Sequence, residues 1–128
     1  MAMAGNRSPL FIFWQARRFN LYLSLEMLAE LEDVLSRPKI QRFVRPTSGK
    51  RFLALLVKRA VFIQPAKSFP RSRDPNDDKV VATAVAAKAD YLITIDKDLY
   101  DDATLVAALA ELGTQVLQPG RFQTLLHQ

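Results

Sequence analysis

One helix and one strand, each bordered by carboxylates, constrain this chain more than any other feature. The helix expected at residues 76–88 has small, mostly apolar side chains from Val80 to Ala87, as in a packed helix, and residues 91–95 are apolar enough for a buried strand. Acidic residues stand at the start of that helix and directly after that strand. In open α/β folds, helix starts and strand ends meet at the edge of the sheet where ligands bind. The pattern therefore favours an α/β fold with a site at that edge.

Short apolar segments alternate with helical patterns along the rest of the chain. Strands are expected at residues 19–23, 61–64, 91–95 and 115–117. Helices are expected at 10–18, 25–36, 39–44, 51–59, 76–88 and 103–112, and from Pro119 or Gly120 to Leu126. This alternation predicts a single α/β domain over residues 1–128, with a four-stranded parallel sheet flanked by helices.

Start and stop signals support several of these helices. Side chains that can cap a helix precede four of them: Ser8, Ser24, Thr47 or Ser48, and Asp102. Helix ends are marked by Pro38 and Gly113. At helical spacing, Phe11, Phe13 and Trp14 are expected to be core or interface side chains, and His127 a residue of the chain end.

The charge is distributed unevenly. The net charge is +5, yet the segment 37–73 holds eleven Lys or Arg and no acid, whereas 74–111 holds nine acids and three lysines. A basic middle followed by an acidic cluster suits a polyanion such as RNA held near a cation site, and a solvated basic helix face is the alternative. Cysteine, a signal-peptide pattern and long apolar runs are absent, so we expect a cytoplasmic protein without a membrane segment.

Three groups of carboxylates are expected at the same edge of the sheet. They are Glu26 and Glu30 in the first turns of helix 25–36, Asp74, Asp77 and Asp78 at the start of helix 76–88, and Asp96 and Asp98 after strand 91–95. Each group alone is also what helix caps and solvated faces produce. Together they form an oxygen-ligand set suited to Mg²⁺ or Mn²⁺, and beside a basic surface this suggests metal-assisted phosphodiester cleavage. Arg71 and Arg73 flank the acids and either contact phosphate or offset neighbouring carboxylates.

At these residues the chain resembles the PIN-domain family, and most of all its bacterial branch of VapC-like toxins from toxin–antitoxin pairs. The stretches that carry the resemblance are 23–39, 73–79 and 89–99. The resemblance implies a Rossmann-like sheet and a Mg²⁺- or Mn²⁺-dependent ribonuclease with RNA as substrate and an antitoxin as partner. It also implies that Glu30, Asp77 or Asp78, and Asp96 hold the metal and that Thr94 lies beside it. Asp74 and Asp98, which belong to the same groups of carboxylates, are expected to support the site.

One departure from the family pattern leads to further expectations. Family members begin with a central strand that ends in aspartate, whereas here no acid precedes Glu26. We therefore expect the chain to lack that strand, with the residues 1–5 standing where its tail would lead into the first helix. The gap would be closed by direct pairing of the flanking strands, by a strand borrowed in a homodimer, or not at all.

The alternative function is a catalytically impaired PIN-like remnant that binds RNA or a protein partner. A third hypothesis is an unrelated α/β protein that binds a phosphate-type ligand. The absence of a Gly-rich loop, the usual phosphate-binding element, counts against it.

Overall fold

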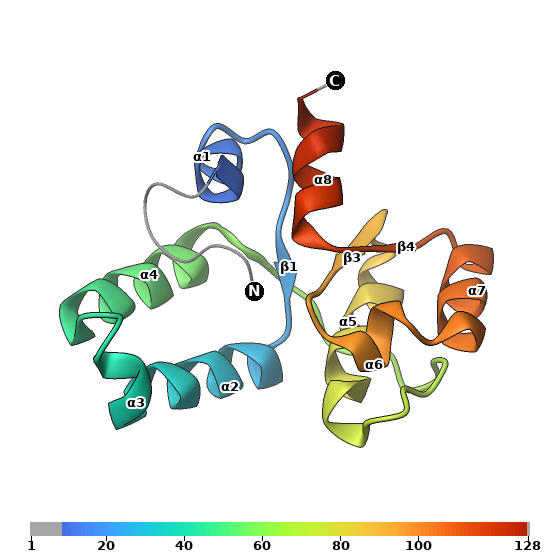
Figure 1. Ribbon diagram of the computed structural model, residues 1–128, viewed down its shortest axis with the longest axis horizontal. Coiled ribbons are helices and arrows are strands. Elements are labelled where there is room, and N and C mark those ends of the chain that lie inside the picture. Colours follow the sequence, from blue (N-terminus) through green and yellow to red (C-terminus); the bar gives the residue numbers. More distant parts are fainter. Residues whose placement is uncertain (1–8, 128) are drawn as a thin grey trace.

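Two groups of helices lie on either side of a central strand and a C-terminal helix in the computed structural model, which describes residues 9–127 (Figure 1). The first group and its strands are α1 (Pro9–Gln15), β1 (Tyr22–Leu23), α2 (Leu25–Ser36), α3 (Pro38–Gln41), α4 (Pro46–Arg59) and β2 (Val61–Phe62). The second comprises the 3₁₀ helix η1 (Pro75–Asp77), α5 (Asp78–Ala87), β3 (Tyr91–Ile93), α6 (Lys97–Tyr100), α7 (Ala103–Glu111), β4 (Gln115–Leu117) and α8 (Pro119–Leu126).

The four expected strands are present, but they do not form one sheet. In the described part of the chain, β1 pairs with β2 in parallel and β3 pairs with β4 in parallel, as two separate two-stranded sheets. The prediction of a single four-stranded sheet is therefore wrong for these residues. The physical reason is that, within residues 9–127, the backbone of β1 is hydrogen-bonded to β2 and that of β3 to β4, and no ladder joins β1 to β3. The expectation about residues 1–5 and the missing first strand lies outside the described residues.

Local signals place most helix ends. Ser24 is fully buried and its Oγ accepts the N–H of Met27, so the predicted cap of α2 is confirmed, as is the cap of α7 by Asp102. The prediction that Thr47 or Ser48 caps a helix is wrong, because α4 already begins at Pro46. Proline has no N–H to satisfy and a fixed φ, and both suit the first helical position. The expected cap Ser8 lies outside the described residues.

Two clusters of buried apolar side chains form the core. The first contains Leu10, Trp14, Leu23, Leu56, Leu117 and Phe122. The second contains Val81, Ala84, Leu92, Leu99, Leu105 and Leu109. The sheet β3–β4 lies between them, because Ile93 and Leu117 pack with the first cluster whereas Leu92 and Val116 pack with the second. Successive strand residues point to opposite faces, so this short sheet serves both clusters.

Aromatic residues of α1 divide between core and surface. Trp14 is buried, which confirms its predicted place in the core, and Phe13 is half-buried with its ring edge-on to His127 at 5.1 Å. The side chain of Phe11 lies outside the described residues. Across residues 9–127, the helices are all too short or too polar to cross a membrane.

Candidate metal centre

Asp74 is fixed at the start of the helical segment η1–α5. Its Oδ1 accepts the N–H of Asn76 at 3.0 Å, and its own N–H donates to Ser72 Oγ at 3.2 Å. Pro75 follows at the first helical position, where proline is favoured. These contacts hold one oxygen of the Asp74 carboxylate in a turn and leave the other available.

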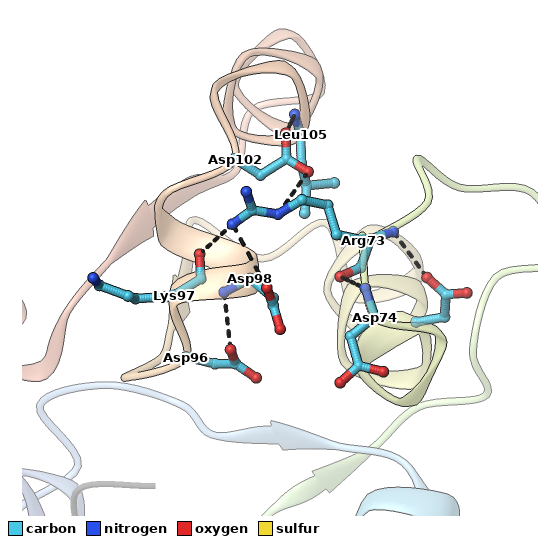
Figure 2. A network of polar contacts seen from close by, with 9 residues as sticks. Arg73, Asp74, Asp96, Lys97, Asp98, Asp102 and Leu105 are labelled. Carbon is cyan, nitrogen blue, oxygen red and sulfur yellow. Dashed lines mark hydrogen bonds and ion pairs between the residues drawn. The ribbon is translucent and has the colours of Figure 1, made fainter.

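A second tight turn fixes the acids that follow β3. Thr94 Oγ1 accepts the N–H of Asp96 at 2.9 Å, and Asp96 Oδ1 accepts the N–H of Asp98 at 2.9 Å. Asp96 thereby caps α6, a short helix that the sequence pattern does not predict. The consequence is that Asp98 stands in the first turn of a helix, with its side chain directed toward η1 (Figure 2).

The two turns bring three carboxylates together. Asp74, Asp77 and Asp98 each offer an oxygen, and these three oxygens lie within 4.8 Å of one another. Figure 2 shows the side chains of Asp74, Asp96 and Asp98 reaching from two different segments toward the same space. Asp74, Asp77 and Asp98, the three residues of the cluster, are all partly buried. Like charges this close repel one another, and a bound cation would relieve that repulsion.

Burial and the neighbouring acids both disfavour the negative charge of Asp77. Its Oδ2 is buried and has no hydrogen-bond partner among the described residues. The pKa of Asp77 is raised from 3.8 to about 7, first by burial, then by hydrogen bonding with Asp96 and by the charges of Asp96, Asp74 and Asp98. An unpaired buried oxygen and a raised pKa both mean that the structure leaves the negative charge of Asp77 uncompensated.

Two other predicted site residues have partners outside this cluster. Asp78 Oδ1 accepts the N–H of Ser72 at 2.9 Å, and its Oδ2 lies 3.5 Å from Arg71 Nη1. Glu30 Oε2 lies 3.2 Å from Lys79 Nζ, so the side chains of α2 and α5 meet beside the centre rather than in it. In this structure, Glu30 and Asp78 do not share the close grouping of Asp74, Asp77 and Asp98.

The two arginines beside the acids contact protein groups. Arg73 Nη2 donates to the carbonyl of Lys97 at 3.0 Å and lies 3.7 Å from Asp98 Oδ1, while its Nε lies 3.9 Å from Asp102 Oδ2 (Figure 2). Arg71 lies over the ring of Phe69 at 4.3 Å as well as beside Asp78. Both guanidinium groups therefore offset carboxylates here and orient the turn that carries them.

Comparison with known proteins identifies the fold family. A family model described as the PIN domain matches residues 2–98, a span that ends on an acid of the cluster. The chain belongs to the PIN-domain family. No curated protein and no solved structure matches it.

The donors of this PIN domain fit a divalent cation. The family is nuclease-type and binds divalent metals, and the three grouped oxygens are all carboxylate oxygens, which are hard ligands. The buried Oδ2 of Asp77 is a second, independent observation in favour of a cation, because a cation would satisfy an atom that no group among residues 9–127 satisfies.

Two features of this PIN domain were not predicted from the sequence. Asp102 was predicted only as a cap, yet its Oδ2 also lies 3.9 Å from Arg73 Nε, a contact between distant segments that no local pattern signals. The effect of Asp96 on the pKa of Asp77 had no sequence signal, because it depends on how two turns far apart in the chain meet.

Proposed function

We propose that this PIN domain is a ribonuclease that requires Mg²⁺ or Mn²⁺, held by Asp74, Asp77 and Asp98. The observation that carries the proposal is the buried, unpaired Oδ2 of Asp77 within 4.8 Å of two further carboxylate oxygens. The excess of basic residues between 37 and 73 supports RNA as the substrate. By resemblance to its family branch, we propose the biological role of a toxin with an antitoxin partner.

The residues of the site then have distinct tasks. Asp77 gives up its proton when the cation binds, since metal ligands must be deprotonated. Asp96 caps α6 and so fixes the turn that carries Asp98, and Arg73 orients the Asp98 carboxylate. We propose that Glu30 completes the acidic wall from α2, where its carboxylate pairs with Lys79. When bound, the cation supplies a Lewis acid that lowers the pKa of a water and polarises a phosphodiester.

The alternative is a PIN domain without nuclease activity that binds RNA or a protein partner. The separation of the two sheets favours it, because no backbone ladder joins β1 to β3. Without that ladder, the distance between Glu30 and the aspartate cluster depends on side-chain packing and on the ion pair with Lys79. A catalytic site that tolerates only small displacements loses activity when such a distance varies.

Two neighbouring aspartates give a matched test. We expect a labelled single-stranded RNA to be cleaved with Mn²⁺ and not with EDTA, and Asp77→Asn to lower the rate about a hundredfold or more. Asp78→Asn should retain most of the rate, because its carboxylate serves Ser72 and Arg71 instead of the cluster. Asp33→Asn, which removes only an exposed ion pair with Arg37, controls for purification and contaminating nucleases. Equal cleavage by the wild type and Asp77→Asn contradicts the proposal, and metal-independent RNA binding without cleavage supports the alternative.

A further inference from the structure

The largest exposed aromatic surface of the described chain lies far from the acidic cluster, between α3 and α4. Phe43 has 86% of its surface exposed, the most among the exposed large apolar side chains of residues 9–127. Its neighbour Val44 is half-buried, and the side chains of Val44 and Leu35 both lie beside Gly49. The N–H groups of Phe43 and Val44 both donate to the carbonyl of Ile40 at 2.9 Å. This tight turn directs Val44 inward and holds Phe43 in solvent.

Exposed arginines stand on both sides of this ring. Arg42 and Arg45 are exposed, and within residues 9–127 neither has a carboxylate at ion-pair distance. Arg71 and Arg73 differ from them, since both are held by carboxylates. We call Arg42, Phe43 and Arg45 the α3–α4 tip. A single exposed phenylalanine needs no explanation, but one set between two unpaired cations in a segment without acids has the chemistry of a base-stacking platform.

We propose that the α3–α4 tip binds single-stranded RNA, with Phe43 stacked on a base and Arg42 and Arg45 on the adjacent phosphates. The inference rests on the proposed function, because it names a second contact for the same substrate. Charge complementarity selects the partner: an apolar protein surface would leave both guanidinium groups desolvated without counter-charges, whereas a nucleic acid supplies the ring partner and the anions together.

The second half of α2 separates the tip from the contact between α2 and α5. Glu30, whose carboxylate meets Lys79 of α5, is the sixth residue of α2, and α3 lies at the end of that helix (Figure 1). The six residues that follow Glu30 rise about 9 Å along the helix axis. A single strand within the range of about 4–16 nucleotides that such binding surfaces contact is therefore long enough to reach both places.

Binding without metal tests the proposal separately from cleavage. The probe is a fluorescent single-stranded RNA of about 12 nucleotides, followed by anisotropy in EDTA at several salt concentrations. We expect Phe43→Ala to weaken binding by about five- to a hundredfold with an unchanged salt slope, since stacking is uncharged. Arg42→Ala and Arg45→Ala should each reduce the slope of log K against log salt by about 0.7, the value for one phosphate of a single strand.

Matched controls make the outcome decisive. Leu112→Ala removes another exposed apolar side chain, and Arg121→Ala another exposed arginine, both on the opposite group of elements. If Phe43→Ala binds as the wild type and Leu112→Ala do, the proposal is overturned. It is also overturned if light scattering shows a dimer that Phe43→Ala dissociates, because the tip would then cover a second copy. If the wild type binds the RNA through the tip but does not cleave it, the nuclease function is rejected and this inference stands. If Phe43→Ala cleaves the same RNA with the rate and affinity of the wild type, this inference is rejected and the nuclease function stands.

Discussion

At the scale of single residues, the neighbours Asp77 and Asp78 show how identical side chains acquire different chemistry. Asp78 accepts the N–H of Ser72 and lies near Arg71, so its charge has two partners. Asp77 has its Oδ2 buried without a partner, beside three other acids. The difference arises because consecutive residues at a helix start point in directions about 100° apart. The side chain of Asp78 therefore contacts the loop before the helix, whereas that of Asp77 lies near the turn after β3.

The raised pKa of Asp77 predicts an unusual pH dependence of stability in the absence of metal. Between the unfolded value of 3.8 and the folded value of about 7, the folded chain holds a proton that the unfolded chain releases. The free energy of unfolding therefore falls as the pH rises through this window. Asp77→Asn, which stays neutral, should be more stable than the wild type at pH 8, by on the order of 1 kcal/mol after solvent screening.

Urea denaturation in EDTA at pH 4, 6 and 8 measures this difference. The two proteins should converge near pH 4, where the wild-type carboxyl is neutral as well. Asp33→Asn is the control, because Asp33 is exposed on α2 and away from the cluster. Parallel pH profiles for the wild type and Asp77→Asn would show that the carboxylates do not repel one another as the structure implies. Added Mn²⁺ should reverse the order at pH 8, because only the wild type keeps all three carboxylates of the cluster.

The kind of candidate site could be predicted from the sequence, but not which acids form it. Acids at a helix start and after a strand were enough to expect an oxygen-ligand centre, and Asp74, Asp77 and Asp98 do come together. The sequence could not separate Asp77 from Asp78, because Ser72 lies in an irregular loop whose path no local pattern specifies. It also could not decide whether Arg73 faces phosphate or carboxylate, since that depends on where α6 and α7 pack.

At the scale of elements, the start of α2 links the fold to the site. Ser24 is fully buried between β1 and α2, and its Oγ accepts the N–H of Met27 at 3.3 Å. Ser24→Ala leaves that N–H without its cap and should lower the free energy of unfolding by about 1 kcal/mol. Ser36→Ala, at the exposed end of the same helix, should cost less. Chemical denaturation of both variants measures the difference, and equal losses would mean that the cap contributes nothing specific.

Elements with strong local signals were predicted well. The bounds of α2, β4 and α8 match the expectation, because a serine cap, a glycine–threonine turn and a proline start define them locally. Helix α6 was missed because its four residues follow from the turn that Asp96 makes with Thr94 and Asp98. The division into two sheets was missed because strand pairing depends on contacts between distant segments, which periodicity does not encode.

At the scale of the whole molecule, the absence of a ladder between β1 and β3 raises the question of cooperativity. Two separate clusters of apolar side chains could in principle unfold independently. The alternation of β3 and β4 argues against this, since Leu92 and Val116 belong to one cluster and Ile93 and Leu117 to the other. Unfolding either cluster exposes one face of the same two strands. We therefore predict one cooperative transition for both groups of elements.

Leu56 and Leu109 test this prediction because each is fully buried in a different cluster. Leu56→Ala and Leu109→Ala should each lower the free energy of unfolding by about 2–5 kcal/mol. In a single cooperative unit, Leu109→Ala reduces amide-exchange protection in β1 and β2 by the same free energy as in β3 and β4, although it touches only the second cluster. Protection lost solely from α5, α7 and their neighbours would mean that the two clusters unfold separately. The metal centre, which joins η1 and α6 of the second group, would then form independently of Glu30 on α2, and Mn²⁺ would stabilise only one half of the molecule.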